Sequence, residues 1–194
     1  MRAVRAWACV ALGTLVMGGC TPDWAANGDS SVIFLMTAIN SGAPLDSDVI
    51  ISSGGVCPDL VNLRLENHFK NPGVTNTGFR HDFTVERYEV RYFRSDGRNT
   101  QGVDVPYSIT GKVAQEVIEE SAATLALEVV RRQAKFEPPL LQLRDSGTMI
   151  VFTAFAEVTL HARTTTGEVL NPVSANLQID FANFVDNLTE CPAP

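Results

Sequence analysis

The chain has few residues of the kinds that build reactive or metal-binding centres. Its 194 residues include only four cysteines and three histidines. The spacings typical of a serine nucleophile elbow, a zinc protease, a phosphate-binding loop or a dinucleotide fingerprint do not occur. The sequence therefore predicts no catalytic residue, no cofactor and no metal ion, and a non-catalytic role is favoured over an enzyme.

Basic residues and long apolar runs are also scarce. The 15 basic residues stand against 22 acidic ones, which gives a net charge of −7. A negative balance of this size argues against binding to nucleic acid or to anionic lipid, and favours neutral or basic partners. Beyond the first twenty residues, charged or polar residues interrupt every apolar segment, so we expect no transmembrane helix there.

Residues 1–19 have the organisation of a secretory signal. Residues 1–5 carry two arginines, and residues 6–17 form an apolar run shorter than the roughly 20 residues of a membrane span. Two glycines then precede Cys20. Cleavage before Cys20 would leave 175 of the 194 residues. It would remove two basic residues and no acidic ones, so the mature chain would have 13 basic and 22 acidic residues and a net charge of −9.

The segment LVMGGC, which ends at Cys20, resembles the lipobox of bacterial signal peptidase II substrates, with Met17 where a branched aliphatic residue is usual. The resemblance implies a diacylglyceryl group on Cys20, cleavage before it and acylation of the new amine, for example with palmitate. Two or three acyl chains would anchor the protein stably in a membrane. Thr21, in place of Asp, implies the outer rather than the inner membrane of a diderm cell envelope. The alternative is a secreted protein with a free Cys20.

The mature chain is expected to hold a tether and one domain. Residues 20–30 hold the lipidated cysteine and a flexible tether; residues 21–30 are rich in turn formers and span at most about 33 Å when extended. Residues 31–194 suit a single domain with a sizeable core. With Cys9 removed and Cys20 acylated, Cys57 and Cys191 remain as the possible disulfide pair in an oxidising compartment. The alternative is two separate buried thiols.

Alternation of apolar and polar residues indicates β-strands along most of the domain. It is clearest at 61–69. In 83–93 the alternation changes phase, which predicts a β-bulge. The apolar run 31–40 is typical of a doubly buried strand, and 49–52 suggests a short one.

The second half is expected to be mostly β as well. Pro106 predicts an edge strand at 103–111. The stretch 112–136 fits either a helix or a strand; we favour a strand at 122–131 and then a short helical turn. Segments 148–163 and 168–184 predict a long hairpin with apolar residues of the second arm on one face.

Together these segments predict an all-β fold, an immunoglobulin-like antiparallel β-sandwich of seven or eight strands with at most a short helix. The chain resembles the immunoglobulin-like and fibronectin-type sandwiches of exported bacterial proteins in architecture. It lacks their Cys–Trp–Cys hallmark, because Trp24 lies in the tether.

Arginines and tyrosines alternate in one region and form the candidate binding surface: Arg87, Tyr88, Arg91 and Tyr92. Both residue types are enriched where partners bind. The alternative is that the tyrosines fill the sandwich while the arginines face water.

Histidines and loop carboxylates are the other candidate site residues. Catalysis would need His81, His161 and a carboxylate to converge, and His68 lies apart from both in the sequence. Calcium could be held by loop oxygens. The candidates are Asp46 with Asp48, Asp96 with Asn99, and Asp186 with Asn187. The same residues also favour turns without any metal.

The leading interpretation is an envelope-anchored, non-catalytic binding or assembly module whose partner is an envelope protein or a glycan. The membrane would be contacted through the N-terminal lipid, and no nucleic acid is expected. The alternatives are an envelope hydrolase with an unrecognised site and a structural module stiffened by calcium.

Overall fold

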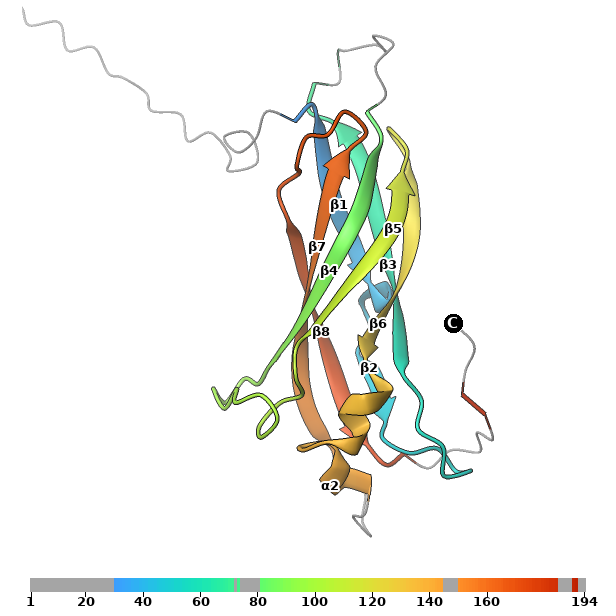
Figure 1. Cartoon of the computed structure of the whole chain (residues 1–194), viewed down its shortest axis with the longest axis vertical. Helices are drawn as coiled ribbons and strands as arrows, with labels where there is room; N and C mark the ends of the chain where they lie inside the picture. Colours follow the sequence, from blue (N-terminus) through green and yellow to red (C-terminus); the bar gives the residue numbers. More distant parts are fainter. Residues whose placement is uncertain (1–29, 72, 74–80, 145–149, 185–189, 192–194) are drawn as a thin grey trace, which may run out of the picture.

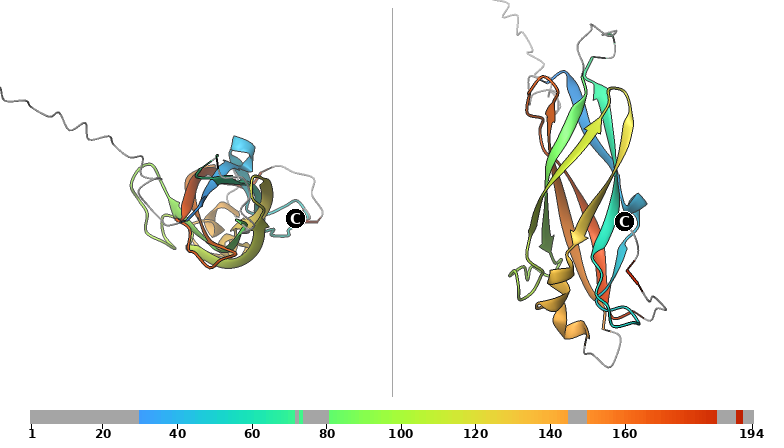
Figure 2. Two further views of the ribbon diagram at one scale, coloured as in Figure 1. Left: turned by 90° about the horizontal axis from the view of Figure 1, so that it is seen from above. Right: turned by 45° about the vertical axis from the view of Figure 1, so that its right-hand side comes forward.

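A computed structural model describes residues 30–71, 73, 81–144, 150–184 and 190–191. In these residues two β-sheets pack face to face, and their strands run along the long axis of the molecule (Figure 1). Viewed along that axis, the two sheets surround one interior (Figure 2). No helix within the described ranges combines the length and the apolar character needed to cross a membrane.

Eight strands form the two sheets. The three-stranded sheet has the order β1 (Val32–Ile39), β3 (Asp59–Phe69), β6 (Ala122–Val130). The five-stranded sheet has the order β2 (Leu45–Asp48), β8 (Val173–Ala182), β7 (Phe152–Thr164), β4 (Phe83–Phe93), β5 (Ile109–Val117). The short helices are η1 (Asn40–Gly42), η2 (Arg132–Phe136) and α2 (Leu141–Arg144). All pairs are antiparallel except β2 with β8, so the predicted all-β sandwich with short helices is confirmed.

The strand order is that of an immunoglobulin-like sandwich. Strands β3 and β6 occupy the places of strands B and E, and β4, β7 and β8 occupy those of C, F and G. Strand β5 extends the second sheet in the manner of strand C′. This arrangement places β7 in the middle of the five-stranded sheet, with β4 and β8 on either side.

The first strand is divided between the two sheets at η1. Asn40 and Ser41 take φ values of 47° and 54°, and Gly42 takes 80°, all in the left-handed region. Asn and Gly tolerate that region, and the Asn40 amide donates to the carbonyls of Ala43 and Pro44 at 3.0 and 3.1 Å. The kink takes the chain from the edge of one sheet to the edge of the other.

Two predictions about the N-terminal strands are wrong. The run 31–40 is not doubly buried: β1 is an edge strand, and Leu35 is 39% exposed. The second strand is Leu45–Asp48 rather than 49–52. Alternation failed there because the inward-facing residue of β2 is Ser47, a buried polar residue.

The edge strand predicted at 103–111 is also misplaced: the edge strand is β5, which begins only at Ile109, and Pro106 lies in the loop before it, since proline has no N–H to donate to a ladder.

The remaining strand predictions are confirmed. A register shift interrupts β4 between Val85 and Arg87, where the phase change predicted a bulge. Within 112–136, β6 matches the favoured strand and η2 the short helical turn, while the first residues belong to β5. On β8 the predicted apolar row faces the core: Val173, Ala175, Leu177, Ile179, Phe181.

A disulfide joins Cys57, just before β3, to Cys191, 134 residues further along the chain. The predicted pairing is therefore present. It fixes the segment after β8 to the loop between β2 and β3.

Candidate functional site

The predicted arginine and tyrosine surface is divided by the sheet. Arg87 and Arg91 are exposed on the outer face of β4, whereas Tyr88 and Tyr92 are only 8% and 6% exposed and point into the core. The Tyr92 hydroxyl donates to the carbonyl of Val129, and burial raises the pKa of Tyr92. The four residues thus do not share one surface, and the tyrosines fill the sandwich as the alternative held.

The outer face of the five-stranded sheet carries rows of polar side chains across β4, β7 and β8. In most rows these side chains satisfy one another. Thr159 and Ser174 share a hydrogen bond at 2.8 Å, and Thr153 donates to Asp180 at 2.5 Å. Arg87 pairs with Glu89. Such contacts, across strands for the first two pairs and along β4 for the third, leave little hydrogen-bonding capacity for a ligand.

The row formed by Arg91, Glu157 and Asn176 differs. The register places Arg91 opposite Glu157 and Glu157 opposite Asn176, about 5 Å apart in each pair. Within the described part of the chain, none of these three side chains has a hydrogen bond or an ion pair. A cation, a carboxylate and an amide are therefore available to solvent in the middle of the sheet.

An aromatic pair lies in the next row. The rings of Phe93 and Phe155 stack with their centroids 5.4 Å apart and their planes 21° from parallel. The two residues are neighbours in register, and both are half-buried although they lie on the outer face. The stacked pair presents an apolar surface, named here the platform, beside the row Arg91, Glu157 and Asn176, whose side chains have no partner among the described residues.

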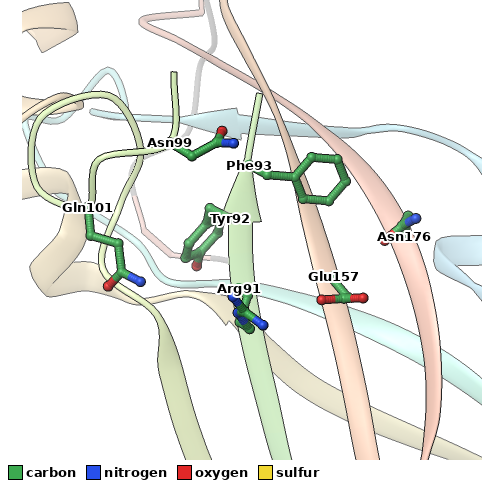
Figure 3. A pocket seen from close by; sticks show the side chains of 7 residues that line it. All are labelled: Arg91, Tyr92, Phe93, Asn99, Gln101, Glu157 and Asn176. Carbon is green, nitrogen blue, oxygen red and sulfur yellow. The ribbon is translucent and has the colours of Figure 1, made fainter. Parts of the chain in front are cut away.

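These features line a groove, named here the outer-face groove, with a volume of about 350 Å³. It is formed by two residues of β4, one of β7, one of β8 and two of the loop after β4: Arg91, Phe93, Glu157, Asn176, Asn99, Gln101. Figure 3 shows the loop amides on one side of β4 and the β7 and β8 side chains on the other. Tyr92 also borders the groove, but its side chain belongs to the core.

Hydrogen bonds within the loop hold its amides in place. Asn99 Oδ1 accepts from the backbone N–H of Arg94 at 2.7 Å. Gln101 donates to Ser108 Oγ at 2.9 Å and accepts from the Ser108 N–H at 3.2 Å. Since a side-chain amide has two N–H donors and two acceptor lone pairs, both amides keep capacity for a ligand.

A second hollow of about 280 Å³ continues the groove toward the edge of β8. Asn176 lines both hollows, and the stacked rings contribute Phe93 to the first and Phe155 to the second. The far wall is apolar and comes from the η1 turn, through Ala43 and Pro44. The combined depression crosses β4, β7 and β8 at right angles to the strands.

The histidines do not converge. His161 Nε2 lies 3.4 Å from Glu89 on the outer face, and His68 lies beside Glu66 at 3.1 Å. His81 Nδ1 is 2.8 Å from Ser31 Oγ, at the end of the molecule where β1 begins. Because His161 pairs in register with Arg87, about 20 Å of strand separates it from His81.

The Ser31 and His81 contact has the composition of a nucleophile and its base. A base of this kind is normally oriented by a carboxylate on its second nitrogen. His81 Nε2 is buried and receives no hydrogen bond from the described residues. Among the described residues, no carboxylate is therefore bound to His81 to complete a hydrolytic triad.

Two of the candidate calcium ligands, Asp48 and Asp96, are occupied by contacts within the protein. Asp96 binds the guanidinium of Arg94, which holds the pKa of Asp96 well below its usual range. Asp48 Oδ1 accepts from the backbone N–H of Ile50 and of Phe184. The pair Asp186 and Asn187 lies outside the described residues, and over the ranges given above no group of three or more metal-ligating side chains occurs.

A second polar cluster lies inside the molecule. The ammonium of Lys135, on η2, is 2.8 Å from Asp59 and donates to the Asp48 carbonyl at 2.7 Å. Ser47 Oγ donates to Asp59 at 2.5 Å. Burial raises the pKa of Asp59, and the opposing effects of Lys135 and Ser47 are smaller. Lys135 is fully buried and the Asp59 side chain is 14% exposed, so the ammonium is reached only by groups of the protein itself.

Analysis of the sequence identified Arg91 but missed its partners in the groove. The alternation of apolar and polar residues predicts that Glu157 and Asn176 face outward on their strands. Only the pairing register of β4, β7 and β8 shows that they lie next to Arg91. Asn99 and Gln101 belong to a loop without a recognisable motif.

Comparison with known proteins adds no relative to the fold described above. The chain matches no protein-family model, and no match was found among curated proteins or solved structures.

Proposed function

We propose that this chain is a lipoprotein, anchored at the bacterial envelope through Cys20, whose sandwich is a non-catalytic binding module. Its ligand binds in the outer-face groove. The single observation that carries this proposal is the uncommitted row Arg91, Glu157 and Asn176 beside the stacked rings of Phe93 and Phe155. Sites for ligands combine an apolar surface with a few convergent polar groups, which is the composition of this groove.

The position of the groove supports a role at a membrane surface. The beginning of β1 lies beside the beginning of β4, because Ser31 contacts His81. A strand rises about 3.3 Å per residue, so Arg91 and Phe93 lie about 30 Å along β4 from this end of the molecule. A domain anchored through residues before 30 would hold the groove clear of the bilayer and open to the side.

The anchor is tested by intact-mass spectrometry of the protein purified from its native membrane. We expect loss of residues 1–19 and the added mass of acyl chains on Cys20. A Cys20→Ser variant should leave the membrane fraction. An unacylated mass in the wild type would contradict the lipoprotein assignment.

Binding is tested by photo-crosslinking in native cells. A benzoylphenylalanine residue replaces Asn176 in the groove or, as the matched control, Asn62, an exposed asparagine on the outer face of β3. We expect adducts at position 176 and none, or far fewer, at position 62. Equal labelling at both positions would overturn the proposed groove.

A further inference from the structure

The polar groups of the outer-face groove have a composition that restricts the ligand. Arg91 and Glu157 carry one charge of each sign, and the remaining polar groups are the amides of Asn99, Gln101 and Asn176. The groove is therefore close to neutral, although the chain has a net charge of −7. A site with this balance has no net attraction for a phosphate, a polyanion or a polycation.

The same groups both donate and accept hydrogen bonds. Arg91 only donates, Glu157 only accepts, and the amides do both. A hydroxyl group also donates and accepts, so a ligand rich in hydroxyls could satisfy all of these groups at once. Asn99 and Gln101 are already held by Arg94 and Ser108, which reduces the entropy lost when they bind.

The backbone in the middle of the sheet cannot take part. At the groove β4 pairs with β7 and β7 with β8, so the backbone N–H and C=O groups are used within the sheet. A peptide that extends a sheet binds at a strand edge through those groups. A ligand over β4 and β7 must instead be held by side chains, whereas along the outer edge of β8 strand β2 covers only Ile179–Ala182.

The stacked rings supply the apolar part of the site. Phe93 lines the first hollow and Phe155 the second. Each ring of the stacked pair turns one face toward its partner and keeps the other, and the electron-rich face of an aromatic ring attracts polarised C–H groups. A pyranose ring has such a C–H face, with hydroxyls at its rim. The rim would lie over Asn176 and Glu157 when the ring lies on the platform.

We infer that the outer-face groove binds a neutral oligosaccharide, with one sugar ring on the Phe93 and Phe155 platform and its hydroxyls on Arg91, Glu157 and Asn176. This inference rests on the proposed function and names its ligand class. The depression crosses three strands and continues to the η1 turn, so it accommodates a chain of sugars rather than a single unit.

The test uses polysaccharide from the native envelope, freed of protein by protease and of lipid by extraction, and separated into neutral and acidic pools by anion exchange. The full-length protein in detergent is run by affinity electrophoresis in gels that contain one pool. We expect the neutral pool to retard the wild type and Asn62→Ala equally. Asn176→Ala should bind about threefold to tenfold more weakly, because one hydrogen bond is lost.

A second variant tests the platform. Phe155→Leu keeps an apolar side chain but removes the aromatic ring. We expect weaker retardation by the neutral pool and a melting temperature lowered by only about a few degrees, since the stacked pair also stabilises the sheet. Retardation by the acidic pool only, by neither pool, or equally for Asn176→Ala and Asn62→Ala would overturn the oligosaccharide inference.

The crosslinking experiment distinguishes a failure of the oligosaccharide inference from a failure of the proposed binding function. An adduct at position 176 that is removed by periodate, which cleaves the vicinal diols of sugars, supports the inference. An adduct that only protease removes would keep the proposed binding role and replace the glycan by a protein. No preference for position 176 over position 62 would overturn both.

Discussion

Two pairs of a cation and a carboxylate differ in how their charges are used. Lys135 and Asp59 lie 2.8 Å apart inside the sandwich, where Ser47 and the Asp48 carbonyl complete their hydrogen bonds. Arg91 and Glu157 are neighbours on the outer face, but no ion pair joins them. The inner pair connects η2 to β2 and β3, whereas the outer pair leaves its hydrogen-bonding groups available.

The comparison separates residues that serve the fold from residues available for binding. A buried charge must be paired, since an unpaired one is costly, so the inner groups have no freedom to bind anything else. Exposed charges are solvated by water and need no partner. Substitution should therefore affect stability at the inner pair and ligand binding at the outer pair.

The largest effect is expected for Lys135→Met, which fills the space of the side chain but leaves Asp59 buried without its cation. We expect a loss of about 3–5 kcal/mol in the free energy of unfolding, measured by urea denaturation followed by circular dichroism. The control is Lys135→Met with Asp59→Asn, which removes the orphaned charge and should recover most of the loss. A loss below about 1 kcal/mol in the single variant would contradict the structural role of the pair.

The same variant has a defined pH dependence. A carboxyl with a raised folded-state pKa binds its proton more tightly when folded, so the free energy of unfolding falls as the pH rises from 3.8 through the folded value. Lys135 opposes this rise in the pKa of Asp59. Its removal should thus cost less near pH 3.8 than at neutral pH. A constant deficit across this range would show that Asp59 is not the group involved.

The second effect concerns the disulfide, another contact committed to the fold. Replacing Cys57 and Cys191 by alanine removes a link across 134 residues and should cost about 2–4 kcal/mol, through the greater entropy of the unfolded chain. Urea denaturation of the double variant measures the loss, with reduced wild-type protein as the control. If reduction leaves the denaturation midpoint unchanged, the link does not stabilise the domain.

The third effect tests packing on the inner side of β4. A Cβ atom on Gly111 would lie 2.3 Å from the Tyr88 ring, so Gly111→Ala forces the ring to move and should cost about 1–3 kcal/mol. The cost should shrink when Tyr88→Leu is present as well. Thermal denaturation measures the stability lost through Gly111→Ala in the wild type and in Tyr88→Leu. An equal loss in both would exclude the contact with Tyr88.

The smallest stability effects are expected in the groove. Asn176→Ala and Arg91→Ala should change the free energy of unfolding by less than about 0.5 kcal/mol, because neither side chain has a partner among the described residues. Asn62→Ala is the matched control. A cost near that of Gly111→Ala would assign this row to the fold and weaken the contrast between the two pairs.

The sequence was sufficient to predict the architecture wherever one face of a strand is apolar. The alternation in β3, β7 and β8 and the phase change in β4 were enough to find those strands and the bulge. Alternation failed at β2, since its buried residue is Ser47, and at β1, because an apolar run does not distinguish an edge strand from a central one.

The candidate site was less predictable for a physical reason. Arg91, Glu157 and Asn176 come from three strands, and only the pairing register makes them neighbours. The burial of Lys135 was equally hidden, because nothing local in 132–136 reveals that Asp59 and the Asp48 carbonyl will meet its ammonium. Local sequence patterns indicate which face of a strand is buried and the period of its side chains. These two clusters depend instead on pairing between residues far apart in the sequence.

The divided first strand has a mechanical consequence. Strand β1 begins at one end of the molecule and pairs along its length with β3, and after η1 the chain pairs again through β2 with β8. Antiparallel hydrogen bonds lie perpendicular to the strands, so tension applied at the start of β1 loads them in shear, and they resist together rather than peeling one by one. The domain can thus carry a pull between its N-terminal end and the outer-face groove, with β2 and β8 as a second clamp.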